Sequence, residues 1–322
     1  MASVEQYMLS QMLNFSDLKH WSCYLNLQNM KRMLTNWETS SFTIYKDIFE
    51  QYGGSVNMHP DVVDYFMKYH NWKLSFFHFK KNNLIKGAYF VCNNQHIGIF
   101  MRRIFPLSSD EVLIPLAPEL RCFLPERTNK LSIYHRSQII NATWSIARKK
   151  QNCLVKDNFS SKFGKNRRNE YQKFLRKGGN IRNMDDFSGE ELVQIYQSLF
   201  RSRFGDTLPC YPAGNLIDFF TYLRHLLYGC ILYFENTPCA FDIILKSESH
   251  LNVYFDVPNG AVKKEYMNFS PGSILMWINI NSAKSYCDEK NKKFIFSIGS
   301  LRPEWEYKLR WADPFFTGKS FC

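Results

Sequence analysis

LNVYFDV at residues 251–257 and, after a polar loop, SPGSILMW at residues 270–277 form the centre of the predicted fold. Alternating side chains in the first segment predict a strand. The Ser-Pro-Gly opening of the second segment predicts a helix start, because a serine hydroxyl can cap the first turn and a proline ring presets its backbone. KFIFSIG at residues 293–299 predicts a second strand. The unit therefore runs strand, helix, strand.

The start of this helix is a candidate anion site. Ser270, Gly272 and Ser273 carry small side chains, so they leave backbone N–H groups uncovered at the positive end of the helix dipole. Such a turn suits a phosphate or a carboxylate. A helix that merely begins here is the alternative interpretation, since four residues are a weak signal.

A basic helix is predicted over residues 162–177. Its aromatic side chains fall on one side, and its basic side chains fall mainly on the other. The candidate anion-binding residues are Lys165, Arg168, Lys173 and Arg176. Only Glu170 opposes seven basic residues in this segment, so internal ion pairs cannot neutralise it. A solvated charged face and an anion-binding face both remain open.

Composition limits the class of protein. The chain has 322 residues, of which 45% are hydrophobic, which suits two packed domains. A net charge of +12 predicts an anionic partner: an acyl donor, nucleic acid or anionic lipid. Nine scattered cysteines lack zinc-site spacing, so we expect no metal and a reduced, cytoplasmic protein. Residues 216–234 are interrupted by charges, so any contact with the inner membrane is expected to be peripheral.

Two halves share one order of elements. We expect a helical extension over residues 1–40, a first domain over 41–158 and a second over 159–322. Each half is predicted to run helix, turn, helix, hairpin, which indicates an internal repeat. In the first half we expect helices at 45–52, 61–70 and 136–149 and strands at 72–79, 84–91, 96–104 and 153–155. In the second we expect helices at 162–177, 189–203 and 215–228 and a hairpin of 230–234 with 239–245.

Several motifs resemble a known superfamily. SPGS with its apolar helix, the strand after it and YKLRW at residues 307–311 resemble the closing half of FemAB-like and cellulose-biosynthesis-type acyltransferases, within the GNAT superfamily. NRRNEYQKF at 166–174, followed by KGG, resembles the basic helix that opens that half. The resemblance covers about residues 151–315. It implies an α/β fold of two GNAT-like halves side by side.

Within that superfamily, the whole chain is most similar to the macrophage-inducible gene fourteen family of bacterial antimicrobial-peptide-resistance proteins. YGG at residues 52–54, HP at 59–60 and the basic helix carry this similarity. The resemblance implies an N-acyltransferase that moves an acyl or aminoacyl group to an amine and contributes to resistance and virulence.

The resemblance also points to catalytic residues. Lys308 matches the near-terminal lysine that lies by donor and acceptor in FemAB-like transferases, where an ammonium can stabilise an oxyanion. Asp256, on one face of the strand, is the candidate base for the incoming amine. A loop-capping role, or a pair with a nearby lysine, is the alternative for Asp256, and Glu265 and Tyr266 are other candidates.

The donor and the reaction stay open at this stage. Acyl-CoA and aminoacyl-tRNA are both candidate donors, because the usual GNAT pyrophosphate pattern of closely spaced glycines is missing. The chain has no P-loop, dinucleotide fingerprint, nucleophile elbow or zinc-hydrolase helix. One alternative is a regulator that binds DNA through residues 162–177, although no helix-turn-helix is apparent. Another is a non-catalytic adaptor on the inner membrane.

Overall fold

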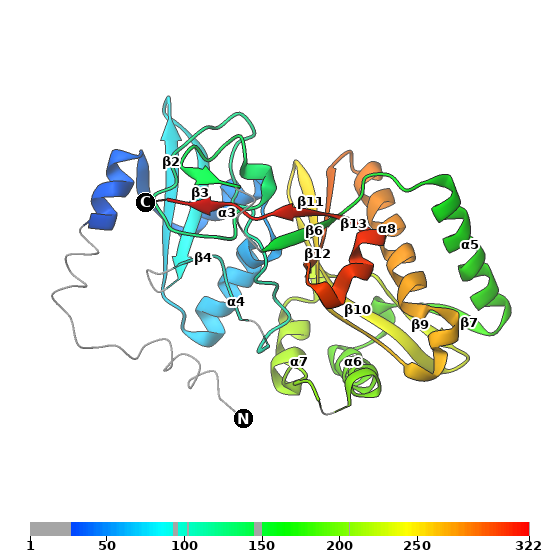
Figure 1. Ribbon diagram of the computed structural model, residues 1–322. Helices are drawn as coiled ribbons and strands as arrows, with labels where there is room; N and C mark the ends of the chain where they lie inside the picture. Colours follow the sequence, from blue (N-terminus) through cyan, green and yellow to red (C-terminus); the bar gives the residue numbers. More distant parts are fainter. Residues whose placement is uncertain (1–26, 93–95, 102, 145–149, 206, 322) are drawn as a thin grey trace.

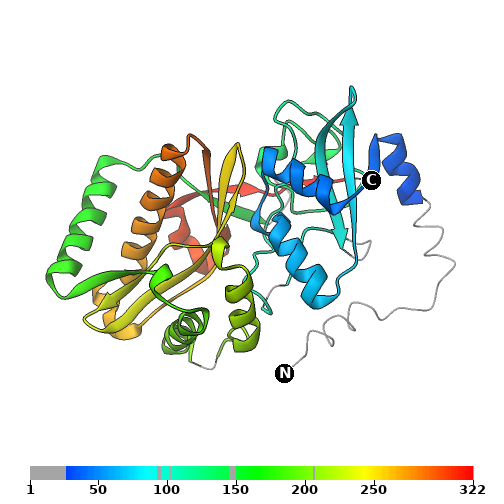
Figure 2. The ribbon, with the colours of Figure 1, turned by 180° about the vertical axis from the view of Figure 1, so that it is seen from behind.

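The computed structural model describes residues 27–92, 96–101, 103–144, 150–205 and 207–321. These residues form two α/β halves that lie side by side (Figure 1; Figure 2 shows the opposite side). The helical extension expected over residues 1–40 lies largely outside the described residues. Residues 27–34 are helical, but β1 (Trp37–Ser40) is a strand. The helix prediction is wrong there because Trp37 pairs with Phe79 and packs in the core at the edge of a sheet.

The first half contains two helices and a four-stranded antiparallel sheet. Helices α3 (Phe42–Tyr52) and α4 (Pro60–His70) confirm two predicted helices. The sheet order is β1-β2-β3-β4, with β2 at Leu74–Lys81, β3 at Leu84–Cys92 and β4 at His96–Ile97. The expected strand 96–104 therefore keeps only two residues in the sheet.

The segment after this sheet departs from prediction. Residues 136–144 form turns and the short strand β5 (Ala142–Thr143), preceded by the 3₁₀ turn η2 (Ile133–His135), and not the expected helix. Residues 145–149 lie outside the described part. Polar side chains explain the difference: Ile114 donates its N–H to His135 Nε2 at 2.7 Å, and Gln138 donates to the Ala117 carbonyl at 2.8 Å. These bonds tie the segment to a neighbouring loop instead of a helical ladder.

The second half is built on an eight-stranded sheet. Its order is β13-β6-β12-β11-β10-β9-β7, and β8 also pairs with β10. The strands are β6 (Gln151–Val155), β7 (Gly179–Asn183), β8 (Leu227–Tyr228), β9 (Cys230–Phe234), β10 (Thr237–Glu248), β11 (Asn252–Val262), β12 (Lys293–Ser300) and β13 (Ala312–Phe316). The helices are α5 (Ser161–Arg176), α6 (Gly189–Phe204), α7 (Ala213–Tyr222) and α8 (Pro271–Glu289). The 3₁₀ segments are η1 (Val56–Met58), η3 (Met184–Asp186), η4 (Arg224–Leu226), η5 (Lys264–Phe269) and η6 (Pro303–Arg310).

The predicted order of helix, helix and hairpin is confirmed in both halves. It appears first as α3, α4, β2, β3 and again as α6, α7, β9, β10. The helix expected at 215–228 ends at Tyr222, before η4. Among the described residues, only the second half adds a parallel strand pair, formed by β11 and β12 around α8. This pair is the strand, helix, strand unit predicted from sequence.

Chain segments cross between the halves. The strand expected to close the first half, β6, lies in the second sheet between β12 and β13. The C-terminal strand β14 (Lys319–Ser320) returns to pair with β5 of the first half. A domain boundary at residue 158 therefore places β6 in the wrong half. Although β6 precedes that boundary in the chain, its hydrogen bonds go to β12 and β13 of the second sheet.

The Gly53 turn holds the two halves together. Ser247 Oγ donates to the Gly54 carbonyl at 2.8 Å, and Asn252 Nδ2 donates to the Tyr52 carbonyl at 2.9 Å. Gly53 has φ +75°, and a Cβ there would lie 2.5 Å from Asn252 Oδ1 and from Ser249 Oγ. Only glycine fits this close approach without strain.

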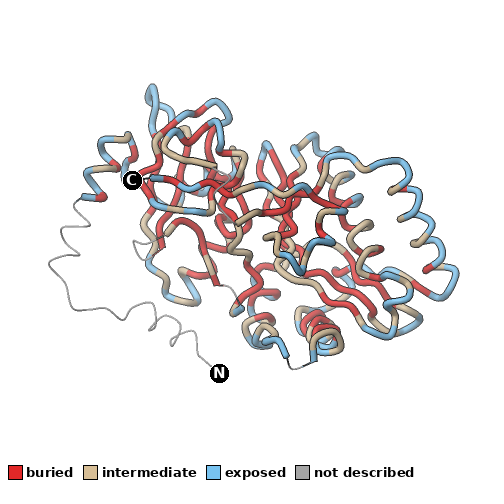
Figure 3. The backbone as a smooth tube through the Cα atoms, in the orientation of Figure 1, coloured by how far each residue is buried: buried red, intermediate tan, exposed pale blue. Residues whose placement is uncertain are grey.

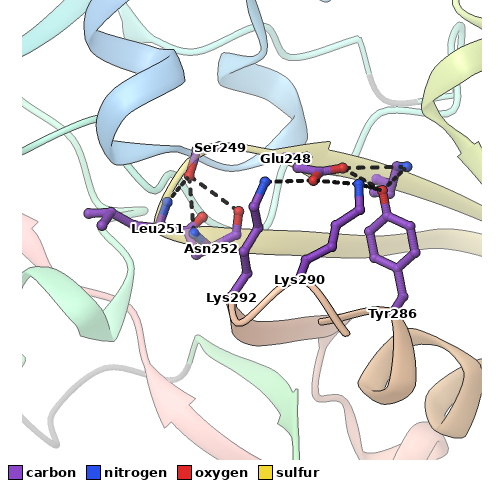
Figure 4. A network of polar contacts seen from close by, with 8 residues as sticks. Glu248, Ser249, Leu251, Asn252, Tyr286, Lys290 and Lys292 are labelled. Atoms are coloured by element: carbon purple, nitrogen blue, oxygen red, sulfur yellow. Dashed lines mark hydrogen bonds and ion pairs between the residues drawn. The ribbon is translucent and has the colours of Figure 1, made fainter. Parts of the chain in front are cut away.

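Beside this turn, Glu248 anchors the β10–β11 hairpin to α8 and to the segment that follows it (Figure 4). Its carboxylate accepts from Lys292 Nζ at 2.6 Å and from Tyr286 Oη at 2.5 Å, and Lys290 Nζ lies at 3.0 Å. Burial alone would raise the pKa of Glu248, but these hydrogen bonds lower it to about 2. The carboxylate therefore stays charged across the physiological range.

The seven cysteines among the described residues are free, and all are buried except Cys210, which is half-buried. This agrees with a chain that needs no disulfide framework within that part. Buried segments run through both halves, and α5 is an outlying and mainly exposed helix (Figure 3).

Candidate functional site

The parallel strands β11 and β12 separate part of the way along. Their pairing ends at Asp256 opposite Ser297, although β11 continues to Val262 and β12 to Ser300. Residues 257–260 are half-exposed, even though β11 is a central strand and both Asp256 and Ala261 are buried. A central strand with an exposed middle indicates a place that the surrounding layers leave uncovered.

Lys308 lies where these strands separate. Its side chain is 8% exposed, and Nζ donates to the carbonyls of Ile298 at 2.5 Å and of Ser300 at 2.8 Å. The ammonium also lies 4.6 Å from the Trp305 ring centroid. Burial lowers the pKa of Lys308, while nearby Cys153, Asp110 and Asp256 act in the opposite direction. An ammonium has three N–H donors, so one remains after the two carbonyls are satisfied.

Asp256 is buried in an acidic environment. Its side chain is 3% exposed, and Oδ1 has no hydrogen-bond partner. Burial, followed by the charges of Asp110 and Glu111, raises the pKa of Asp256 well above its usual range, and Lys308 only partly offsets this. The alternation expected for this strand is confirmed: Tyr254 packs in the large core cluster that joins both halves, whereas Val253 and Phe255 pack in the cluster that contains residues of α8.

Sequence reasoning missed the first half's contribution to this site. Tyr254 Oη donates to Glu111 Oε1 at 2.7 Å, and Asp110 Oδ2 accepts from the Ser300 N–H at 3.0 Å. Gly299, with φ +75°, leaves room between Asp110 and Lys308: a Cβ would lie 3.0 Å from Asp110 Oδ2 and 3.7 Å from Nζ. Asp110 and Glu111 come from a loop of the other half, and nothing in the local pattern marks them.

The turn at Ser270 differs from the predicted cap. Ser270 is the N-cap of α8, but it adopts a left-handed conformation with φ 54°, and its side chain makes no capping bond. Its carbonyl accepts the N–H groups of Ser273 at 2.9 Å and of Ile274 at 3.2 Å. The hydroxyl-cap prediction is therefore wrong, because backbone geometry satisfies the first turn. The expected bare turn also offers fewer amide donors than predicted.

The turn at Ser270 and the Asp256 side chain lie near different parts of β11. A Cβ at Gly272 would lie 3.2 Å from Val262 Cγ1, which places the start of α8 beside the far end of β11. Val262 lies six positions after Asp256, which is a distance of about 20 Å along an extended strand. Lys308 and Asp256 act on each other electrostatically, and Ser270–Ser273 lie apart from Asp256, so only an elongated ligand could contact both places.

The basic helix is confirmed as α5, which begins after a Ser160 cap. The side chains of Lys165, Arg168, Lys173 and Arg176 are all exposed. Arg167, which breaks the sequence pattern, is half-buried and bonds to Glu170 at 2.7 Å. Strand β7 follows the Gly178-Gly179 turn. A second recognition helix does not follow α5 directly.

Two kinds of feature are missing from the described part of the chain. No group of three or more His, Cys, Asp or Glu side chains there is arranged to hold a metal ion. No helix there is both long and apolar enough to cross a membrane.

The two α/β halves, with the parallel strands β11 and β12 on either side of α8 in the chain, form a fold that the protein FemX shares. The crystal structure of FemX has a TM-score of 0.53 to this chain, with 7% identity over 88% of this chain and 96% of FemX. L-PGS from Bacillus licheniformis has a TM-score of 0.42, with 14% identity over 80% of this chain and 76% of L-PGS. At such identities the likeness to FemX concerns the fold alone.

The chain belongs to the Mig-14 family, whose family model matches residues 59–320. No curated protein matches its sequence. The family resemblance expected from the sequence is confirmed, and the fold expected from the wider resemblance is the fold that FemX shares.

Proposed function

We propose that the protein is an N-acyltransferase of FemAB-like type, which moves an acyl or aminoacyl group to an amine. The observation that carries the proposal is that Lys308 and Asp256 are both buried near the point where β11 and β12 stop pairing. Family membership and the FemX-like fold support the reaction class.

Lys308 would stabilise the oxyanion that forms when the amine attacks the acyl carbon. Its two bonds to backbone carbonyls fix Nζ in position, and its third N–H remains for the substrate. Little reorganisation is then needed during the reaction, which is the main advantage of such a fixed donor.

Asp256 would act in its neutral form. Burial and the charges of Asp110 and Glu111 raise its pKa, which favours the protonated form, and a protonated carboxyl group donates a hydrogen bond instead of accepting a proton. The base role expected from sequence thus suits Asp256 less well than a donor role beside Lys308.

An elongated donor fits the separation of the two parts of the site. Its reactive end would lie at Lys308, and its anionic end would lie toward Ser270, Gly272 and Ser273. Acyl-CoA and aminoacyl-tRNA both have this shape and charge. The exposed basic face of α5 favours a donor with many phosphates. The acceptor would be an amine of an envelope component or peptide, and the reaction would contribute to antimicrobial-peptide resistance and virulence, as the family implies.

Thermal stabilisation of the purified protein tests the proposal. The ligands are acetyl-CoA, an acyl-CoA of longer chain, aminoacyl-tRNA with uncharged tRNA as its control, duplex DNA and anionic lipid vesicles. Ligand at 100 times its Kd stabilises a protein by about 2.7 kcal/mol. We expect stabilisation by an acyl or aminoacyl donor and then transfer to an amine. Stabilisation by DNA alone would instead favour the regulator, and stabilisation by vesicles alone would favour the adaptor.

A further inference from the structure

Asp242 is a second buried carboxyl group, on the strand next to β11. It is 8% exposed, and its Oδ2 has no hydrogen-bond partner. It pairs directly with Gly260 of β11, where a Cβ would lie 2.0 Å from Asp242 Oδ1. The carboxyl group therefore occupies the space that any other residue at position 260 would fill. Gly260 itself is half-exposed, so this place is reached from the uncovered part of β11.

Groups from three other elements act on Asp242 electrostatically. The positive charge of Arg203 on α6 opposes the effect of burial on Asp242, and Asp242 in turn raises the pKa of Cys230 on β9. Burial is the main cause that raises the pKa of Tyr307 on η6, and Tyr307 also interacts electrostatically with Arg203, which lowers its pKa, and with Asp242, which raises it. Tyr307 is 48% exposed and directly precedes Lys308. Asp242 thus lies beside the half-exposed stretch of β11 that follows Asp256.

Asp242 and Asp256 have opposite surroundings. The neighbours that raise the pKa of Asp256, beyond its burial, are two acids, whereas the neighbouring charge that acts on Asp242 is a cation. Burial raises the pKa of Asp242 to about 7. A general base works best when its pKa is near the working pH, and an unpartnered buried oxygen gains most from a new hydrogen-bond donor.

We propose that Asp242 binds the acceptor as a primary ammonium group and takes its proton, at a subsite bounded by Gly260 and Tyr307. This inference rests on the proposed function and names the acceptor side of that reaction. A single buried carboxylate selects a compact cation with hydrogen to donate, so it would reject an acylated or otherwise neutral nitrogen.

The transfer then balances as follows. The Asp242 carboxylate takes one proton from the ammonium, which frees the nitrogen lone pair. The lone pair forms the new N–C bond at the acyl carbon, and the bond to the leaving oxygen or sulfur breaks with its electron pair. The second nitrogen proton passes to that leaving atom. The products are the amide, the protonated leaving group and a proton on Asp242.

Binding of a simple amine tests the subsite without knowledge of the donor. The probes are 6-aminohexanamide and its N-acetyl derivative, which differ in the ammonium group, followed by ligand-observed NMR. We expect wild-type protein to bind the amine but not its acetyl derivative. Asp242→Asn should reduce amine binding at least tenfold, and Asp47→Asn, at an exposed position on α3, should leave it unchanged.

The pH dependence of the wild-type protein provides a second readout, which needs no variant to fold. A carboxylate with a pKa of about 7 loses about tenfold in its ionised fraction for each pH unit below that value. Amine binding should therefore weaken by about tenfold from pH 6 to pH 5. Equal binding of both probes, pH-independent binding, or no saturable binding by the wild type would overturn the proposal.

The two proposals fail in different ways. If Asp242→Asn transfers acyl groups to amines at the wild-type rate, the subsite is wrong and the reaction class stands. If the amine binds through Asp242 but no donor binds, the subsite stands and the reaction class is wrong.

Discussion

Replacing Asp242 with Asn should make the protein more stable at high pH, and the size of the effect follows from the buried carboxyl group. Its pKa in the folded state, about 7, lies above the ordinary 3.8. Because the folded pKa is raised, the stabilising contribution of the bound proton is present at low pH and is lost as pH rises toward 7. Each pKa unit corresponds to 1.36 kcal/mol, so the total loss is about 4 kcal/mol. Roughly 2 to 3 kcal/mol of this falls between pH 5 and pH 8.

Urea unfolding of wild type and Asp242→Asn at pH 5, 6, 7 and 8 measures this difference. The asparagine side chain also changes the unfolding free energy by an amount that does not depend on pH. The quantity to compare is therefore how the difference in unfolding free energy between the variant and the wild type changes with pH. We expect the variant to gain on the wild type as pH rises, while Asp47→Asn follows the wild type. A stability difference that stays constant over this range would refute the assignment of a raised pKa to Asp242.

Three further variants test the fold and the basic helix. Glu126→Gln should cost about 3 to 5 kcal/mol of unfolding free energy, because it leaves the buried Arg32 guanidinium, 2.6 Å from that carboxylate, without its counter-charge. Gly53→Ala should lower the urea midpoint and increase hydrogen exchange of the β10–β11 hairpin, since its Cβ would collide with Asn252 and Ser249. Combined Lys165→Glu, Arg168→Glu and Arg176→Glu should abolish binding of the preferred polyanion, and each lost phosphate contact should reduce a duplex-DNA salt slope by about 0.9.

Each of these variants has a matched control. Glu119→Gln breaks an exposed pair with Lys86 and should leave the unfolding free energy nearly unchanged, because solvent screens this pair. Gly205→Ala keeps the strain of a positive φ but meets no atom within 4 Å, so it isolates the collision at Gly53. Charge reversal of the exposed Lys80, Lys81 and Arg121 changes net charge equally, away from α5. A variant that behaves like its control in stability or binding would contradict the role given to the feature it changes. These features are the buried Arg32–Glu126 ion pair, the close approach at Gly53 and the basic face of α5.

Local pattern predicted the elements that fold by local rules. The alternation from Leu251 to Val257 placed Tyr254 and Phe255 on opposite faces, and the small and basic residues at each end of α5 predicted its bounds to within a residue. The same rules failed at 136–144, because His135 and Gln138 form hydrogen bonds with backbone groups of a loop that precedes them by 21 residues. Local pattern carries no information about such partners.

The candidate site shows the same division. Resemblance predicted Lys308 and strand alternation predicted Asp256, and in the structure both are buried and act on each other electrostatically. Asp110, Glu111 and Asp242 were missed, because their roles depend on burial and on neighbours from other elements. A glycine opposite an acid across a strand pair, as at Gly260, is visible only once the register is known.

Transfer activity of Lys308→Ala tests the central claim most directly. The donor selected by thermal stabilisation is used with a primary amine, and donor affinity and turnover are measured for both proteins, with circular dichroism as the folding control. Loss of a fixed oxyanion donor costs about 100-fold to 1,000-fold in turnover. We expect that loss with donor affinity changed by less than about threefold, since the ammonium acts only in the transition state. Wild-type turnover in the folded variant would contradict the catalytic role of Lys308.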